Sequence, residues 1–271
     1  MPFTGVPGHE FVGVVERGPA ELVGARVVGE INAPCGSCET CAAGRGNHCP
    51  HRSVVGIQDR HGAFAERLAL PAANLHRVPE TVETAAATFT EPLAAALRIQ
   101  EQVRWAPGSR VVVVGAGRLG QLIARTLGVT DCGLSVIARS DRPRSLLDNQ
   151  GIHTTTADTL CSGTADLVVE CTGNPEGYAI ARRLVRPGGT LVLKSTYAGQ
   201  LTLDASMLVV DEITVMGSRC GPFAPALDAL ARGTVDVEPL IAARYTLADG
   251  EQALAKAGEA GVLKVLIECS G

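Results

Sequence analysis

The stretch Arg110-Val111-Val112-Val113-Val114-Gly115-Ala116-Gly117-Arg118-Leu119-Gly120 decides the fold of this chain. A run of valines is typical of a parallel strand that is buried on both faces. Gly115, Gly117 and Gly120 then give G-x-G-x-x-G, which permits a tight turn, lets a pyrophosphate approach the backbone and packs a helix on the strand. Apolar residues follow at helical spacing, and the N–H groups that open a helix favour an anion. The stretch therefore predicts a dinucleotide-binding strand–turn–helix unit whose candidate cofactor-binding residues are Gly115, Gly117, Arg118, Leu119 and Gly120.

Around this unit, apolar strand-like runs alternate with helical segments, as in a doubly wound parallel sheet of the α/β class. A helix is expected at 93–103. The expected strands are 111–114, 134–138, 166–170, 190–194 and 213–217.

The residues on either side of this region have a different composition and secondary-structure pattern. Residues 1–93 are glycine-rich and β-leaning, with short strands expected at 11–15, 26–31 and 63–70. After residue 217 the pattern predicts helices near 224–232 and 248–257 and a final strand at 263–268.

Composition narrows the function. The chain has 271 residues and a net charge of −4 without a basic block, which argues against a nucleic-acid partner. No apolar run reaches membrane-spanning length, and no signal peptide is recognised. Nine cysteines are an odd number, and four of them are clustered at metal-binding spacing. We therefore expect a reducing, cytoplasmic location with no membrane partner.

The clustered cysteines predict a structural metal site. Cys35, Cys38, Cys41 and Cys49 follow C-x2-C-x2-C-x7-C in a glycine-containing loop. Four thiolates from one short loop close a tetrahedron around zinc and leave no position for a substrate. An iron–sulfur cluster is the alternative, since a proline follows Cys49, but the last gap is longer than in ferredoxin motifs and no second cluster motif follows.

With these cysteines, Pro7-Gly8-His9-Glu10-Phe11-Val12-Gly13, Glu91-Pro92-Leu93-Ala94 and the glycine turn stand in one order along the chain. This order resembles the zinc-containing medium-chain dehydrogenase/reductases, over essentially the whole sequence. The resemblance implies a GroES-like catalytic domain and a Rossmann domain, and hydride transfer between a nicotinamide and a small-molecule alcohol or carbonyl. The expected domains are 1–93 with a zinc lobe at 32–50, 94–218 for the cofactor, and 219–271 partly returning to the first.

The resemblance also implies catalytic residues. His9 matches the imidazole ligand of a catalytic zinc, Glu10 matches the adjacent carboxylate that can enter the metal shell, and Glu91 matches the last protein ligand. Chemistry of this kind needs a Lewis acid on the substrate oxygen and a hydride carrier beside it.

The chain departs from the family at its beginning. Only eight residues precede His9 and none is the cysteine that the family places there. We expect an incomplete GroES-like β-rich domain, an impaired catalytic zinc site with Glu10 as the third ligand, and a homodimer or higher homo-oligomer that pairs the open sheet edge. The segments 207–210 and 213–215 are a second candidate edge for a partner subunit.

The residues after the second expected strand, 134–138, indicate whether the chain prefers NAD(H) or NADP(H). NAD-binding proteins carry an acid about 20 residues past the glycines, and Ala138 takes that place here. Arg139 and Ser140 suit a 2′-phosphate, with Arg142 or Arg144 adding charge. NADP(H) is therefore expected, and NAD(H) stays possible through Asp141, which we expect to cap the next helix instead.

Other strand ends supply softer candidates. Thr172 and Gly173 are expected near the cofactor ribose, and Ser195 and Thr196 near the nicotinamide. The leading hypothesis is a zinc-dependent, NADP(H)-preferring oxidoreductase. The alternatives are a family member without catalytic zinc, acting as a zinc-independent reductase or in non-redox biosynthesis, and a cofactor-binding regulatory protein.

Overall fold

The computed structural model describes residues 3–197 and 199–269, and these residues divide into two compact units. Unit 1 combines Met1–Ala94 with Pro222–Gly271, and unit 2 is the continuous stretch Ala95–Gly221. That the chain functions as domains 1–93, 94–218 and 219–271 stays a prediction. Within the described part, no helix is both long and apolar enough to span a membrane.

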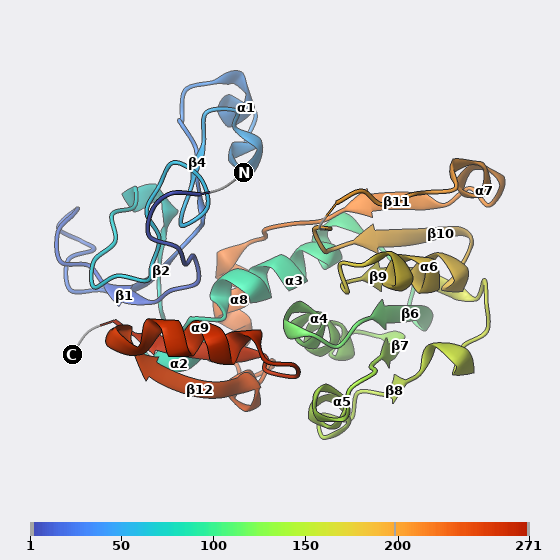
Figure 1. Cartoon of the computed structure of the whole chain (residues 1–271). Coiled ribbons are helices and arrows are strands. Elements are labelled where there is room, and N and C mark those ends of the chain that lie inside the picture. The colour runs from blue at the N-terminus through green and yellow to red at the C-terminus, as the bar shows by residue number, and fades with distance from the viewer. Residues whose placement is uncertain (1–2, 198, 270–271) are drawn as a thin grey trace. The chain divides into compact units, whose positions relative to one another are not determined.

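Unit 2 is built on a parallel sheet with the strand order β11-β10-β9-β6-β7-β8 (Figure 1). Its strands are β6 (Ser109–Val114), β7 (Cys132–Ile137), β8 (Thr154–Thr155), β9 (Ala165–Glu170), β10 (Val185–Leu193) and β11 (Thr214–Gly217). Its helices are α3 (Thr90–Gln102), which begins in unit 1, α4 (Arg118–Gly128), α5 (Asp141–Asp148), α6 (Pro175–Leu184) and α7 (Ala205–Val210). The predicted doubly wound α/β sheet is confirmed.

The valine run explains why β6 lies in the middle of this sheet. Val111 to Val114 are all buried, because β6 pairs with β7 on one side and β9 on the other while helices cover the faces. Leu122, Ile123 and Leu127 of α4 are buried at helical spacing. A strand with two neighbours and two covered faces has no polar side to alternate with, which is what the unbroken valines indicate.

Unit 1 contains small sheets and short helices. Its strands are β1 (Gly13–Val14), β2 (Arg26–Gly29), β3 (Asn32–Ala33), β4 (Ser53–Val54), β5 (Leu75–Arg77), β12 (Ile241–Thr246) and β13 (Lys264–Glu268). Its helices are α1 (Glu39–Ala42), α2 (Thr84–Ala87), α8 (Phe223–Ala231) and α9 (Gly250–Gly258). The antiparallel sheet β1-β2-β5 comes from the first segment, whereas β12 and β13 form a parallel pair from the second, with α9 packed on it.

Several expected elements were wrong in detail. The strand expected at 63–70 does not form: the N–H groups of Gly62, Ala63 and Phe64 donate to carbonyls of Val6, Gly8 and Pro7 outside any ladder. The strand expected at 11–15 shrinks to β1. β10 begins earlier than expected because a register shift between Val185 and Thr190 lets it pair again with β9.

Candidate active site and metal centres

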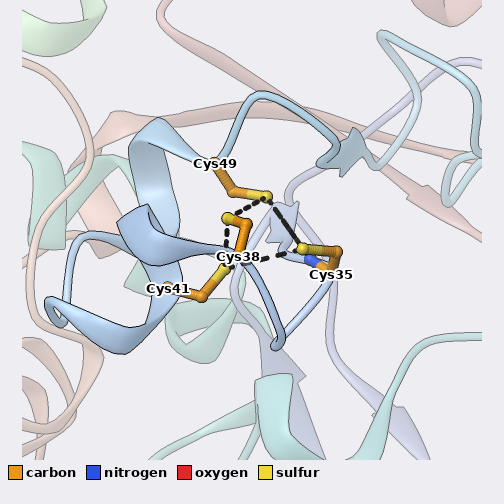
Figure 2. A group of neighbouring side chains, drawn as sticks. All are labelled: Cys35, Cys38, Cys41 and Cys49. Atoms are coloured by element: carbon orange, nitrogen blue, oxygen red, sulfur yellow. Dashed lines mark hydrogen bonds between the residues drawn. The ribbon is translucent and has the colours of Figure 1, made fainter.

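The four clustered cysteines lie together in unit 1 (Figure 2). The Sγ atoms of Cys35 and Cys49 are 3.5 Å apart, those of Cys38 and Cys41 3.5 Å, those of Cys38 and Cys49 3.7 Å, and those of Cys35 and Cys41 3.9 Å. Cys38 is the N-cap of α1 and Cys41 lies three residues further along its single turn, whereas Cys49 directly follows the 3-10 helix Gly46–His48. Gly36 has a left-handed backbone (φ +78), which lets the loop between Cys35 and Cys38 fold back on itself.

These sulfurs fit zinc. A tetrahedral site with Zn–S bonds of about 2.3 Å places its sulfurs about 3.8 Å apart, and none of the four cysteines forms a disulfide. Hydrogen bonds from the backbone N–H groups of Ser37 and Cys38 lower the pKa of Cys35 to about 6. Desolvation, together with the hydrogen bond to Cys38, raises the pKa of Cys41 to about 12. All four positions of the tetrahedron come from the protein, so the arrangement suits a structural ion.

A second candidate metal centre lies in the same unit. His9, Glu10 and Glu91 each offer one ligand atom, and these atoms lie within 4.8 Å of one another. His9 and Glu10 belong to the segment before β1, and Glu91 lies in the first turn of α3. All three residues are half-buried. Zinc bonds of about 2.0–2.2 Å to nitrogen and oxygen bring ligand atoms to about 3.4 Å from one another, so small side-chain movements suffice. The donor set fits a divalent ion and leaves room for an exchangeable ligand.

Sequence reasoning missed the cation beside this centre. Lys264 of β13 donates from Nζ to Glu10 Oε2, and it is well buried, with 13% of its side chain exposed. The two residues are 254 positions apart. A lysine in a short strand carries no periodicity signal that points to Glu10, so only the fold could reveal this pair.

The glycine turn of unit 2 has the geometry of a dinucleotide site. Gly115 has φ +107, a left-handed backbone that a side chain would strain. A Cβ at Gly120 would lie 2.1 Å from the carbonyl oxygen of Gly115 and 3.2 Å from Cys171 Sγ, so α4 reaches the turn only with glycine there. Gly117 is the N-cap of α4, and no atom lies within 4 Å of a Cβ built on it. Arg118 is exposed and Leu119 half-buried in the first turn.

A buried carboxylate holds the neighbouring strand end, and sequence reasoning missed it as well. Glu170, with 0% exposure, accepts hydrogen bonds at Oε1 from the N–H of Thr172 (2.6 Å), its hydroxyl (2.5 Å) and the N–H of Gly173 (3.2 Å). Its Oε2 accepts from the hydroxyl of Tyr197 at 2.6 Å. Desolvation, followed by this hydrogen bond, raises the pKa of Tyr197. Glu170 therefore ties the turn after β9 to the one after β10. The signal available in the sequence was a charged residue, Glu170, at the end of an otherwise apolar strand.

The end of β7 carries the expected basic residues. Arg139 is exposed and pairs with Glu176 at 3.1 Å, Ser140 is the N-cap of α5, and Arg142 is exposed. Arg144 donates to the Ala138 carbonyl oxygen at 2.7 Å. The expectation that Asp141 caps the helix was wrong. It is the first residue of α5, where its charge favours the helix N-terminus without capping it.

The remaining cofactor candidate, Ser195, lies just beyond β10 and is half-buried. The Cβ and Oγ of Ser195 would lie 3.4 and 3.8 Å from a Cβ built on Gly173, and the Thr196 carbonyl oxygen 3.2 Å from it. The ends of β9 and β10 are thus in close contact, as neighbouring parallel strands require. Cys171, between Glu170 and Thr172, is half-buried, and desolvation by its surroundings raises the pKa of its thiol.

A parallel sheet with a glycine-rich phosphate turn, joined in one chain to a small β-rich unit with a four-cysteine lobe and a His–Glu–Glu centre, defines a zinc-containing nicotinamide-dependent oxidoreductase. Comparison with known families agrees. The alcohol dehydrogenase GroES-like domain matches residues 1–80, and the zinc-binding dehydrogenase family matches residues 106–232. The chain belongs to the zinc-containing medium-chain dehydrogenase/reductase family, and it is an enzyme of the NAD(P)-dependent alcohol dehydrogenase type.

Individual relatives cover nearly the whole chain. L-threonine 3-dehydrogenase of Streptomyces avermitilis is 30% identical over 97% of this chain and 82% of its own length. D-xylulose reductase A of Aspergillus oryzae is 27% identical, over 97% of this chain and 80% of its own. A Sinorhizobium meliloti protein assigned as a zinc-binding dehydrogenase, solved with NADP bound, superimposes with a TM-score of 0.88 at 27% identity, covering 97% of this chain and 83% of that one.

Proposed function

We propose that this chain interconverts a small polyol-like or hydroxy-acid-like alcohol and its carbonyl, with NADP(H) as the preferred hydride carrier. The observation that carries the proposal is the convergence of His9, Glu10 and Glu91 within 4.8 Å in unit 1. Relatives named for xylulose and threonine chemistry support a substrate with neighbouring polar groups. In this assignment unit 1 supplies the catalytic residues and unit 2 supplies the cofactor site.

The roles of the side chains follow from their chemistry. His9 and Glu91 would hold a zinc ion, with Glu10 beside it or as a third ligand. A zinc ion there would polarise the substrate oxygen, and the nicotinamide would give or accept the hydride. Because all three side chains are half-buried, their charges are screened less than they would be in bulk water.

The cofactor preference rests on charge. Ala138 offers no carboxylate to a ribose 2′-hydroxyl, and Arg139 is exposed beside it. The surface pair of Arg139 with Glu176 is weak, since exposed ion pairs contribute about 0–1 kcal/mol. Arg139 is therefore available to a 2′-phosphate at small cost. The NADP-bound Sinorhizobium meliloti structure supports the same preference.

Self-association is proposed from the edge of the sheet. β11 pairs only with β10 in the described chain, so one side of its backbone is open. Near it, Val209 and Val210 of α7 are 75% and 72% exposed, and Val215 of β11 is exposed too. An open edge flanked by exposed apolar side chains favours pairing with a second copy. Val215→Lys should shift the mass measured by light scattering toward the monomer. The location we propose is the cytoplasm, because the cysteines are free thiols.

The function is tested by metal content and turnover. We expect the purified chain to hold one tightly bound zinc ion and a second, more weakly bound one, to oxidise NADPH with a panel of hydroxy-ketones, and to reduce NADP+ with polyols. His9→Ala and Glu91→Ala should abolish turnover and retain one zinc, whereas Glu83→Ala, an exposed glutamate before α2, serves as the control. Turnover that survives His9→Ala would contradict the zinc-dependent assignment and indicate a zinc-independent reductase.

A further inference from the structure

The environment of Lys264 sets it apart from the other lysines and arginines of unit 1. Its Nζ donates to Glu10 Oε2 and lies 3.5 Å from the Thr88 carbonyl oxygen. The same ammonium lies over the ring of Phe89, 4.7 Å from its centroid. Its side chain is 13% exposed and that of Glu10 is 32% exposed. The ammonium is therefore largely withdrawn from water and neutralised by Glu10.

Three chain segments meet at this ammonium. Lys264 comes from β13, Glu10 from the segment before β1, and Thr88 and Phe89 from the turn that leads into α3. Glu91 stands two residues after Phe89, so Lys264 contacts both segments that carry candidate metal ligands.

The Glu10 carboxylate lies between two cation sites, the proposed metal position and the Lys264 ammonium. One of its oxygens lies within 4.8 Å of ligand atoms of His9 and Glu91, and its Oε2 accepts from Lys264. A carboxylate shared with an ammonium donates less charge to a metal, and an ammonium close to a dication repels it. Both effects oppose entry of Glu10 into the metal shell, and burial strengthens them because screening by water is reduced.

We propose that Lys264 is a positioning residue that competes with the metal for the Glu10 carboxylate and thereby sets the metal affinity of the His9–Glu10–Glu91 centre. With Lys264 in place, Glu10 is held at the margin of the metal shell, and the ligands are His9, Glu91 and exchangeable molecules. Without it, Glu10 becomes a full third ligand. The inference rests on the metal centre proposed above.

The experiment measures metal binding without turnover. The 271-residue chain is first loaded with one zinc ion at Cys35, Cys38, Cys41 and Cys49. It is then titrated with Zn²⁺ against a chromophoric chelator, and in parallel with Co²⁺, whose visible spectrum reports the coordination of the second site. The variants are Lys264→Met, which keeps a long side chain over Phe89 without charge, and Lys264→Arg, which keeps the charge. Each is made in the wild-type chain and in a Glu10→Gln background. Circular dichroism verifies that every variant is folded.

Lys264→Met should tighten Zn²⁺ binding at least about tenfold, the scale on which a charge within ~4–6 Å alters proton binding, and should change the Co²⁺ spectrum. Lys264→Arg should restore the wild-type affinity and spectrum. In the Glu10→Gln background, Lys264→Met should change the Zn²⁺ affinity by less than about threefold, because the carboxylate for which the lysine and the metal compete is then absent. A residue that only stabilises the fold would not produce this dependence on Glu10.

Three results would overturn the inference. Weaker metal binding in Lys264→Met would mean that the lysine supports the centre instead of competing with it. Equal tightening with and without Glu10→Gln would mean plain charge repulsion. In both of these cases the metal centre itself stands. If no variant binds a metal beyond that of the cysteine lobe, the proposed centre fails and the inference fails with it.

Discussion

Replacing Gly120 and Gly117 separately by alanine should divide folding from cofactor binding. An alanine Cβ at position 120 would lie 2.1 Å from the Gly115 carbonyl oxygen and 2.9 Å from its carbonyl carbon, both of them backbone atoms. Non-bonded heavy atoms are best placed about 3.5–4.0 Å apart. The turn or α4 must therefore move by more than about 1 Å, and no flexible side chain can absorb the shift.

The size of the effect follows from this clash. Overpacking costs typically 1–3 kcal/mol, and Gly120→Ala belongs at the upper end because Cys171 Sγ, 3.2 Å away, closes the other side. A loss of about 3 kcal/mol lowers the melting temperature of a domain of this size by roughly 10 °C. At Gly117, by contrast, a Cβ meets nothing within 4 Å and φ is −70. Its stability change should stay within about 1 kcal/mol, the usual scale of a changed N-cap.

The assay pairs denaturant unfolding with cofactor titration. Gly117→Ala should unfold like the wild type but bind NADP(H) at least about tenfold more weakly, since a methyl group now occupies the space where the pyrophosphate approaches the backbone. Gly120→Ala should lose stability even without cofactor. Equal stability of the two variants would refute the packing argument, and unchanged cofactor affinity in Gly117→Ala would refute the placement of the pyrophosphate.

Three further outcomes are expected. Arg139→Ala should weaken NADP(H) by about 1.5–3 kcal/mol, the value of a charge-assisted hydrogen bond, and leave NAD(H) unchanged in fluorescence titrations; equal losses would contradict the preference. Cys38→Ser should lower the zinc content by one ion and the melting temperature of the protein, and the same drop should follow removal of zinc by a chelator; a brown protein would indicate iron–sulfur instead. The Arg186 guanidinium, 2.7 Å from Asp166, and the N–H of Arg110 hold the pKa of Asp166 below its usual range. This contribution is present above the unfolded pKa of about 3.9 and is lost as the pH falls through the folded pKa, so Asp166→Asn should destabilise the protein by at most ~1 kcal/mol at pH 7 and by progressively less as the pH is lowered through the acid range.

The sequence predicts elements whose surroundings are uniform. The valines of β6 are covered on both faces, and the apolar residues of α4 face one layer, so each leaves a regular pattern. The cysteine spacing similarly confines four sulfurs to one loop, and the structure brings them within 3.9 Å along each measured pair. That these sulfurs bind zinc stays a prediction.

Elements with mixed surroundings were not predictable. β12 has no fully buried side chain and alternates between half-buried and exposed residues only from Ala243 to Thr246, and it was not expected at all. The segment 63–70 has strand-like residues but donates its hydrogen bonds to an irregular neighbour. The contacts of Glu170 and of Lys264 depend on which segments the fold brings together. Local propensity contains no information about that choice.

The two-part composition of unit 1 sets an order of events during synthesis on the ribosome. Unit 2 is continuous from Ala95 to Gly221, so all of its residues are translated before the second segment of unit 1. Domains generally fold as units while the chain grows. The first segment of unit 1, residues 1–94, therefore stays without β12, β13 and α9 while the parallel sheet of unit 2 forms. A nascent chain from which unit 2 has just emerged would carry a folded parallel sheet beside an unfinished unit 1, and it would be the form most in need of chaperone protection.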